Sequence, residues 1–428
     1  MTTIAATQNP AAQKPAVGQG YPDASRYVDG PIDPAMDRDP FSALGKLMLQ
    51  GQVVKQEPSG DPALRLPDNM MFSHFGREVY VALSFNAARK VASDAKNFSN
   101  ELGYATLRQT FGETLMTMDG AGHAKMKRLV LPSFGHRIVN EDLVKMATPI
   151  VEQTLDAFAG DGQGELISQF TAKFPFLIIA KMFGVPASLA QEAENLVIDG
   201  TSMADNPERA LAALHGMDAM YQKVVDAHRA QPADDLVQAL IDTEVDGVKL
   251  SDAEIVSFLK QIMAAGLDTT TRQVANLIYL LLENPDQFDD LKANPELLEN
   301  AIFEAMRFES AGGSVPRVAL HDTEVEGVVI PKGAGVYACI HSANRDPARW
   351  DNPDKFDIRR ERKQFMTLSA GPHACLGANL TIAEQKIAMT SMLSRLKNLR
   401  KDPQRWNDVA IRGFMLRSAT QLPVLWDT

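Results

Sequence analysis

The chain has 428 residues, and its 43 lysines and arginines against 54 aspartates and glutamates give a formal net charge of −11. An acidic chain lacks the basic footprint of a nucleic-acid-binding protein, and 45% hydrophobic with 23% charged residues is typical of a globular protein. Only two cysteines occur, Cys339 and Cys375, which excludes a disulfide framework and a four-cysteine zinc site. Because no apolar run reaches about 18 residues and no secretory signal is recognisable, we expect a cytoplasmic protein without a membrane span.

The chain starts with a segment that offers little to bury and continues without an obvious linker. Residues 1–24 are small, polar and interrupted by proline, so we expect a flexible arm, followed by one domain over 25–428. Helix periodicity between glycine and Asn-Pro stops predicts helices at 141–159, 189–200, 207–230 and 234–242. Strand patterns are few and cluster at 315–321, 324–330 and 336–341. The prediction is a mainly α protein with a small β region.

One predicted helix is much longer than the others. A capping box of Ser251 and Glu254 starts it, and an Asn-Pro pair stops it after Glu283. That is about 32 residues or ~48 Å, so the helix should cross the whole molecule. Its middle is weak, because Gly266 stands next to a run of threonines at 269–271. Two interpretations stay open for this middle: a close crossing of two helices, or a bent turn that leaves room beside the axis.

The most informative stretch is the loop from Leu368 to Gly377. Glycines at Gly371 and Gly377 bracket Cys375, and an apolar helix is predicted directly after them. A thiolate at a helix N-terminus is stabilised by the helix dipole and by free N–H groups, and it can attack a substrate or bind a metal. A buried cysteine that acts as a small hydrophobic residue is the alternative. The two glycines favour a close approach of another group to this backbone.

This loop resembles the haem-ligand loop of the cytochromes P-450, whose signature is Phe-x-x-Gly-x-His/Arg-x-Cys-x-Gly. Gly371, His373, Cys375 and Gly377 fall in register with it, while Leu368 replaces the usual phenylalanine. The resemblance implies that this replacement changes the haem potential more than haem binding. Further stretches resemble the family in the same order, over about residues 25 to 425. They lie at 174–186, 265–270, 304–307, 344–346 and 353–360.

The resemblance implies a single-domain cytochrome P-450 fold whose long central helix lies over haem b, with Cys375 as the axial thiolate and metal ligand. Lysine stands at Lys127 where the family has arginine, and either Lys127 or Arg128 is expected to reach a haem propionate. The expected cofactor-binding residues are His123, Lys127, Ala265, Gly266, Arg317, Gly371, His373, Cys375 and Gly377.

The pair Glu304 and Arg307 lies at i, i+3 on a predicted helix. A solvated pair at this spacing stabilises a helix by only about 0.2–0.5 kcal/mol. The resemblance implies a different arrangement, in which both are buried and joined by Arg360. These three residues would then be structural, and they would hold the loop that presents Cys375.

The resemblance also implies a monooxygenase that inserts one oxygen atom from O2 into a hydrophobic small organic substrate, by hydroxylation or epoxidation. Thr269 would hold an ordered water beside the oxygen, and Asp268 would relay protons from solvent, so these two are the expected catalytic residues. A terpenoid, steroid, alkane or aromatic fits an apolar pocket. The expected substrate-binding residues are Phe111, Leu115, Met116, Ile262, Ala265, Val315, Phe414 and Met415.

A small iron–sulfur ferredoxin and an NAD(P)H-dependent ferredoxin reductase are the implied electron donors to a monomer. Basic residues near the cysteine loop would form a docking patch, or alternatively a solvated charged face. They are Lys127, Arg128, Arg359, Arg360, Arg362 and Lys363. Cys339 lies in an apolar strand pattern, and we expect it to be an inert core residue.

Three other functions are each consistent with part of this pattern. A hydrolase with a cysteine nucleophile leaves the Glu304-x-x-Arg307 pair without a purpose. A haem-thiolate peroxygenase would need a carboxylate or an Arg-Pro feature on the central helix, where Asp268 and Thr269 stand. A haem sensor without catalysis would not need this acid–alcohol pair.

Overall fold

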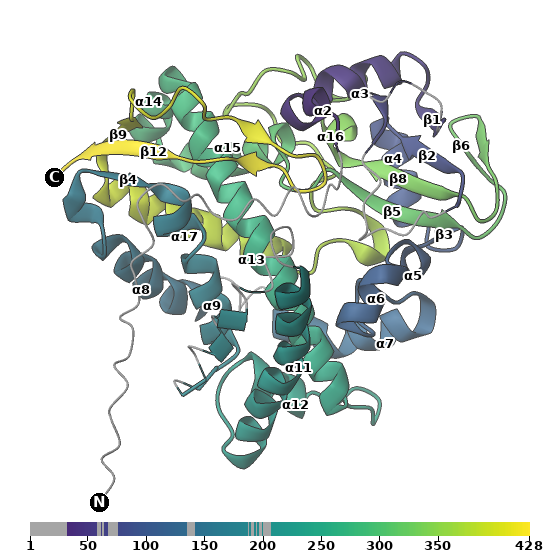
Figure 1. The fold of residues 1–428 in the computed structure, drawn as a ribbon, viewed down its shortest axis with the longest axis horizontal. Helices are drawn as coiled ribbons and strands as arrows, with labels where there is room; N and C mark the ends of the chain where they lie inside the picture. Colours follow the sequence, from purple (N-terminus) through teal and green to yellow (C-terminus); the bar gives the residue numbers. More distant parts are fainter. Residues whose placement is uncertain are drawn as a thin grey trace, which may run out of the picture.

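The structure is a computed structural model, and it describes residues 32–57, 61, 64–66, 76–134, 142–186 and 207–428, with further isolated positions between 188 and 199. The proposed arm at 1–24 lies outside these residues, and the proposed helix at 189–200 is described only in part. Helices dominate and a smaller sheet region lies to one side of them (Figure 1). The predicted fold class, mainly α with a small β region, is confirmed.

The described helices agree with the helices expected at 141–159, 207–230 and 234–242. Helix α11 covers the predicted 207–230, and α12 and α8 are two to five residues shorter than predicted. None of the helices that the structure describes is long and apolar enough to cross a bilayer. The α-helices are α2 (Pro34–Arg38), α3 (Pro40–Met48), α4 (Phe85–Ser93), α5 (Asn100–Gly103), α6 (Ala105–Phe111), α7 (Gly120–Val130), α8 (Leu143–Asp156), α9 (Phe174–Met182), α11 (Pro207–Ala230), α12 (Leu236–Asp242), α13 (Asp252–Glu283), α14 (Pro285–Ala293), α15 (Leu298–Phe308), α16 (Ile340–Asn344) and α17 (Ala378–Arg395).

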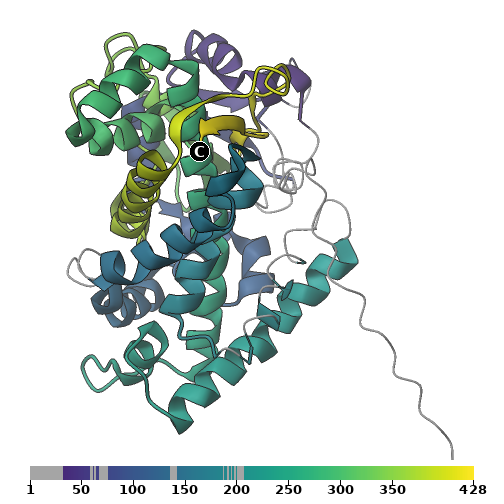
Figure 2. The ribbon, with the colours of Figure 1, turned by 90° about the vertical axis from the view of Figure 1, so that its left-hand side faces the viewer.

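Helix α13 is the long helix that the sequence predicts, with the same start and the same end. The Ser251 side chain accepts from Glu254 N, and the Glu254 carboxylate accepts from Ser251 N, so the capping box is formed. The helix has 32 residues and runs through the centre of the molecule (Figures 1 and 2). It continues through its weak middle, where Gly266 packs against α9. A Cβ atom at Gly266 would lie 3.0 Å from the Ile179 side chain, so a close helix crossing does occur here.

The main sheet has five strands in the order β1 (Val53–Gln56), β2 (Val79–Ala82), β8 (Gly335–Cys339), β5 (Ser314–Ala319) and β3 (Phe98–Ser99). Strands β2 and β8 are parallel and the other neighbours are antiparallel. The sequence patterns did not predict β1 and β2. Three small sheets contain the remaining strands: β6 (Thr323–Val325) with β7 (Val328–Ile330), β10 (Ile411–Arg412) with β11 (Ser418–Ala419), and β12 (Pro423–Asp427) between β4 (Gln163–Glu165) and β9 (Lys397–Lys401).

Two of the predicted strands have wrong boundaries. The segment 324–330 is a hairpin, because Glu326 and Gly327 take left-handed φ angles of 50° and 79° and reverse the chain between β6 and β7. The segment 336–341 leaves the sheet at Cys339. There the N–H groups of Ile340 and His341 both donate to Gly313 O and helix α16 begins.

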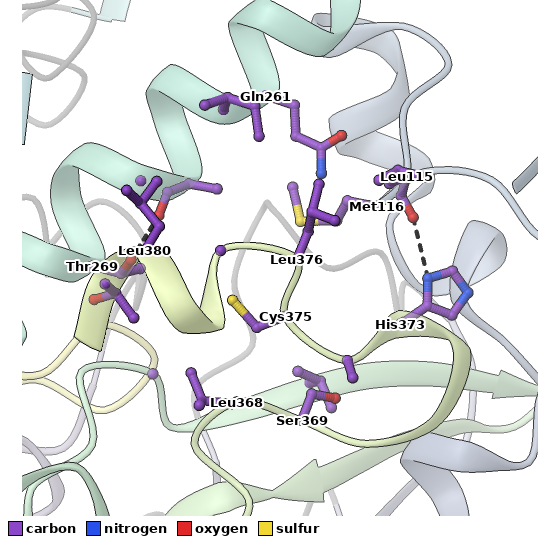
Figure 3. A pocket seen from close by; sticks show the side chains of 18 of the residues that line it. Leu115, Met116, Gln261, Thr269, Leu368, Ser369, His373, Cys375, Leu376 and Leu380 are labelled. Carbon is purple, nitrogen blue, oxygen red and sulfur yellow. Dashed lines mark hydrogen bonds between the residues drawn. The ribbon is translucent and has the colours of Figure 1, made fainter. Parts of the chain in front are cut away.

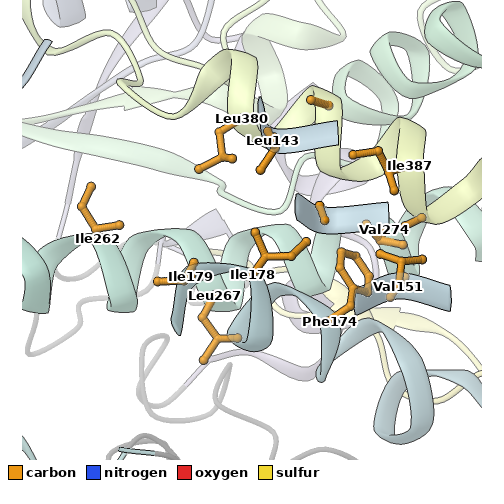
Figure 4. Close-up of a cluster of buried hydrophobic side chains, with 14 of the residues drawn as sticks. Leu143, Val151, Phe174, Ile178, Ile179, Ile262, Leu267, Val274, Leu380 and Ile387 are labelled. Atoms are coloured by element: carbon orange, nitrogen blue, oxygen red, sulfur yellow. The ribbon is translucent and has the colours of Figure 1, made fainter. Parts of the chain in front are cut away.

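The largest hydrophobic core surrounds α13 and connects it to α8, α9 and α17 (Figure 4). Leu267 and Val274 of α13 belong to this core together with Phe174 and Ile178 of α9, and all four side chains are almost completely buried. Each such side chain contributes about 1.5–3 kcal/mol when it is removed from water. The core therefore holds the middle of α13 in place relative to α17, which begins directly after the cysteine loop.

Candidate functional site

A cavity of about 350 Å³ lies between the middle of α13 and the loop 368–377. The Sγ atom of Cys375 points into this cavity from the loop, and Thr269 borders it from α13 (Figure 3). Cys375 has accessible surface because it faces the cavity, although protein encloses it on its other sides. The structure therefore brings together two segments that are about 100 residues apart in the sequence.

The cysteine loop is shaped by its backbone. Cys375 N donates to Leu368 O at 2.9 Å, and Ser369 N donates to Met366 O at 2.8 Å, which closes the loop on itself. Gly371 has a φ of 74°, and a Cβ atom there would lie 2.5 Å from the Cα of Ser93 in α4. The backbone of Gly371 thus approaches α4 closely. Gly371 was expected to bind the cofactor, but it does not line the cavity. Gly377 does line it and precedes the first residue of α17.

The environment of Cys375 suits a thiolate that is bound to a metal. Burial raises the pKa of the Cys375 thiol, and an N–H group of Gly377 acts in the opposite direction. A buried thiol therefore needs a positive charge to lose its proton, and a coordinated metal ion supplies one. Among the described residues no three His, Cys, Asp or Glu side chains form a metal cluster. A metal at Cys375 must therefore bring most of its ligands with it, as the iron of a porphyrin does.

Arg317 is a second feature that fits a haem group. It lies on β5, is only 2% exposed and borders the cavity. Its guanidinium donates to Pro316 O at 2.8 Å and to Ala92 O at 3.3 Å, but within the described part of the chain it forms no ion pair with a carboxylate. Burial lowers the pKa of Arg317. A buried cation with only carbonyl partners is costly, and an anionic propionate would compensate it.

Two histidines and a lysine border the cavity on the α7 side. The rings of His123 and His373 have centroids 4.1 Å apart. His373 Nδ1 donates to Leu115 O at 3.1 Å, and Nε2 lies 3.3 Å from Asp119 Oδ1. Burial, followed by the charges of His373 and Lys127, lowers the pKa of His123 to about 4. His123 is therefore neutral at pH 7.

The structure distinguishes Lys127 from Arg128. Lys127 borders the cavity and its ammonium donates to Pro372 O in the cysteine loop. Arg128 instead lies on the surface, where it pairs with Asp246 at 3.1 Å. Of the two basic residues that the sequence offered for a propionate, only Lys127 is at the cavity.

Asp268 and Thr269 face different surroundings although they are adjacent. Thr269 lines the cavity and its hydroxyl donates to Ala265 O at 2.6 Å. Asp268 does not line the cavity, and its Oδ2 accepts from Arg272 Nε at 2.8 Å. The other oxygen, Oδ1, is buried without a hydrogen-bond partner in the described part of the chain. Asp268 precedes Thr269 by one residue, so its side chain is rotated by ~100° about the helix axis relative to that of Thr269. This rotation turns the Asp268 carboxylate away from the cavity.

Five of the eight expected substrate-binding residues line the cavity, namely Leu115, Met116, Ile262, Ala265 and Val315. Phe111, Phe414 and Met415 do not, because a separate hydrophobic cluster with Tyr337 and Cys339 contains all three. The ring of Phe414 packs edge-on against His341, with centroids 5.3 Å apart. The sulfur of Met415 accepts from Ser314 Oγ at 3.2 Å.

Gln261 and Glu384 are among the polar residues at the cavity that sequence patterns missed. Gln261 precedes Ala265 by four residues, so helical spacing alone was sufficient to find it. Glu384 lies on α17 and is only 1% exposed. Burial raises the pKa of Glu384 to about 8 against a smaller opposing contribution from a hydrogen bond with Thr270. The position of Glu384 in the predicted helix gives no indication that its side chain is buried.

Glu304, Arg307 and Arg360 meet behind the cysteine loop. Arg307 donates from Nε and Nη2 to the two oxygens of Glu304, each at 2.8 Å, and Arg360 Nε donates to Glu304 at 3.1 Å. Both arginines also donate to Lys355 O. Because Glu304 and Arg307 are at most 4% exposed, this cluster is a buried ionic clamp that holds the segment 351–360 against α15.

The basic residues proposed for a docking patch are largely neutralised by acidic partners. Arg359 pairs with Asp290 at 2.6 Å, and Arg362 pairs with Glu299 at 2.6 Å. Arg360 belongs to the buried clamp and Arg128 pairs with Asp246. Lys363 makes a long contact to Arg349 O at 3.5 Å. The patch is therefore weaker than the sequence suggested.

Comparisons with known proteins agree with this site. The family model described as "Cytochrome P450" matches residues 201–419. The cytochrome P450 YjiB of Bacillus subtilis is 30% identical over 331 residues, which cover 75% of this chain and 83% of that protein. The mycinamicin IV hydroxylase/epoxidase of Micromonospora griseorubida is 29% identical over 400 residues, covering 90% of this chain and 98% of that protein. The structure of CYP109Q5 from Chondromyces apiculatus superimposes with a TM-score of 0.81 at 26% identity, over 92% of this chain and 97% of that one.

Proposed function

The chain belongs to the cytochrome P450 family, whose members bind haem through a cysteine thiolate. From this premise we propose that it is a monooxygenase in which the Cys375 thiolate would bind the iron of haem b. In the proposed reaction one oxygen atom of O2 enters a hydrophobic organic substrate, by hydroxylation or epoxidation. The observation that carries the proposal is the position of the Cys375 Sγ in a buried cavity under α13, where no three His, Cys, Asp or Glu side chains of the described residues form a metal site of their own. The name of the Micromonospora relative, a hydroxylase/epoxidase, supports the reaction type.

When it is bound, the haem supplies the activation of O2 and the transfer of oxygen, for which a thiolate ligand is suited. The role of this chain is to bind and orient the group. Arg317, which is buried and pairs with no carboxylate in the described part of the chain, would hold one propionate. Lys127 and the pair His123 and His373 would hold the propionates from the α7 side. Ala265 and Gly266 are small residues, so they leave space for a bound group between α13 and the cysteine loop.

Proton delivery is the second task of the protein. The Thr269 hydroxyl already donates to Ala265 O, so its lone pairs remain available to hold a water molecule or to accept a proton in the cavity. Asp268 does not line the cavity and is paired with Arg272. We assign it the transfer of protons from the solvent side to the Thr269 side through its Oδ1 atom, which has no other partner among the described residues.

A hydrophobic substrate fits the walls of the cavity. Met116, Ile262 and Val315 present apolar surface to it, which suits a terpenoid, a steroid, an alkane or an aromatic compound. Electrons would come from a small iron–sulfur ferredoxin and an NAD(P)H-dependent reductase. Arg359 and Arg362 are exposed cations that a ferredoxin with an acidic surface would meet.

The proposal is tested with the visible spectrum of the reduced, carbon-monoxide-bound holoprotein. We expect the red-shifted Soret band of a haem thiolate in the wild type and its loss in Cys375→Ser. Cys339→Ala is the matched control, because Cys339 is fully buried in the apolar core and should not affect the band. A Soret band at the position of a haem–imidazole complex in the wild type would disprove the axial role of Cys375.

A further inference from the structure

One amide side chain that borders the cavity forms no hydrogen bond through its oxygen with any residue that the structure describes. Gln261 extends from α13 into the cavity on the side of Leu115 and Met116 (Figure 3). Its Oε1 atom is buried and has no hydrogen-bond partner among the residues that the structure describes. A buried amide that lacks a partner destabilises the protein, and a ligand that provides the partner recovers that free energy.

Several other polar side chains on the cavity wall are already engaged, although Glu384 Oε1 and Ser369 Oγ also lack hydrogen-bond partners among the described residues. Gln273 donates to Glu309 O at 3.3 Å and accepts from Ala311 N at 3.0 Å. Asn100 donates to Met116 O, and Thr269 donates to Ala265 O. Gln261 therefore differs from Gln273, Asn100 and Thr269, because no described residue forms a hydrogen bond with its amide oxygen.

The position of Gln261 indicates which part of a substrate it would meet. Gln261, Ala265 and Thr269 succeed one another at intervals of four residues, so they share one face of α13, and all three line the cavity. The first and the last are ~12 Å apart along the helix axis. The residues beside Gln261 are the apolar Leu115, Met116 and Ile262. A substrate atom at Gln261 thus lies far from the Thr269 end, where oxygen is transferred.

We propose that Gln261 determines specificity by binding a hydroxyl or carbonyl oxygen of the substrate at the end remote from the oxidised carbon. The inference rests on the proposed function and narrows its substrate class to elongated apolar molecules with one terminal oxygen function. The amide Nε2 serves both kinds of oxygen, because its N–H groups can donate to a hydroxyl oxygen or to a carbonyl oxygen. A plain alkane leaves the amide without a partner and is a poor ligand.

The experiment uses ligands that every haem protein with an open iron site can bind. Alkylimidazoles, from butyl to decyl, attach to the iron through the imidazole and produce a characteristic shift of the Soret band. Each is compared with a matched imidazole that carries a hydroxyl group in place of the terminal methyl. Dissociation constants are measured by spectral titration for the wild type, for Gln261→Leu and for the control Gln231→Leu, which makes the same substitution at an exposed glutamine outside the cavity.

We expect the hydroxyl group of the longer ligands to be favoured in the wild type by about threefold to tenfold relative to Gln261→Leu, as for one net hydrogen bond. The butyl pair should show no such difference, because its end cannot reach the amide. Gln231→Leu should keep the wild-type preference. The proposal is wrong if the hydroxyl-to-methyl ratio is the same in wild type and Gln261→Leu at every length, or if Gln231→Leu abolishes it equally. Absence of any Soret shift in the wild type would instead refute the haem site itself, and the inference with it.

Discussion

At the scale of single residues, the different surroundings of Thr269 and Asp268 predict different defects. Thr269→Ala removes the hydroxyl that borders the cavity, so the haem-thiolate spectrum should persist while less product forms per NADH consumed and hydrogen peroxide appears. Asp268→Asn should slow turnover but keep coupling, because the hydroxyl remains. Thr271→Ala is the control, since Thr271 donates to Thr171 O instead of bordering the cavity. Unchanged coupling in Thr269→Ala would remove this residue from the mechanism.

Glu384 predicts a pH dependence of stability. Its pKa is raised by burial from 4.5 to about 8. As the pH rises above 4.5, the unfolded chain releases a proton that the folded protein retains, so this group destabilises the fold progressively up to about pH 8. Glu384→Gln should therefore gain free energy of unfolding over the wild type between about pH 5 and pH 8, by at least about 2 kcal/mol.

Urea unfolding of the holoprotein at several pH values measures this difference. Glu361→Gln, a change of an exposed glutamate, is the matched control and should follow the wild type at each pH. A constant difference between Glu384→Gln and the wild type over the whole range would show that Glu384 is ionised in the folded protein.

At the scale of elements, the clamp of Glu304, Arg307 and Arg360 connects α15 to the segment before the cysteine loop. Glu304→Gln leaves two arginines without their counter-charge, and at least Arg307 is fully buried, so we expect a loss of about 3–5 kcal/mol in the free energy of unfolding and a lower haem content. Glu299→Gln is the control, because Glu299 pairs with Arg362 and Lys386 on the surface, and such pairs contribute about 0–1 kcal/mol. Equal losses in both variants would contradict a special role of the clamp.

At the scale of the whole molecule, the net charge of −11 makes the few cations near the cysteine loop the sites where an acidic ferredoxin would bind. Arg362→Glu places a negative charge beside Glu299, so the KM for the ferredoxin should rise at low salt and the effect should fade at high salt. Arg400→Glu reverses a comparably exposed paired arginine on β9 and should leave this KM unchanged. No effect of Arg362→Glu would exclude this residue from the docking site.

The sequence by itself determined the features that depend on neighbours in the chain. The capping box of α13 requires two side chains three residues apart, and the helix has the predicted ends. The i, i+3 spacing places Glu304 and Arg307 on one helix face, and the pattern around Cys375 located the loop at the cavity. Such signals are reliable because hydrogen bonds and periodicity within a few residues produce them.

Only the tertiary structure decided which side chains face the cavity. Phe414 and Met415 pack in a different cluster, Lys127 rather than Arg128 reaches the cavity, and the buried Arg317 is left without a carboxylate partner among the described residues. Likewise the unpartnered amide of Gln261 is visible only when α13, the segment with Leu115 and the cysteine loop are packed together. Burial and the balance of charges depend on elements that meet across long sequence separations, so no local pattern of residues encodes them.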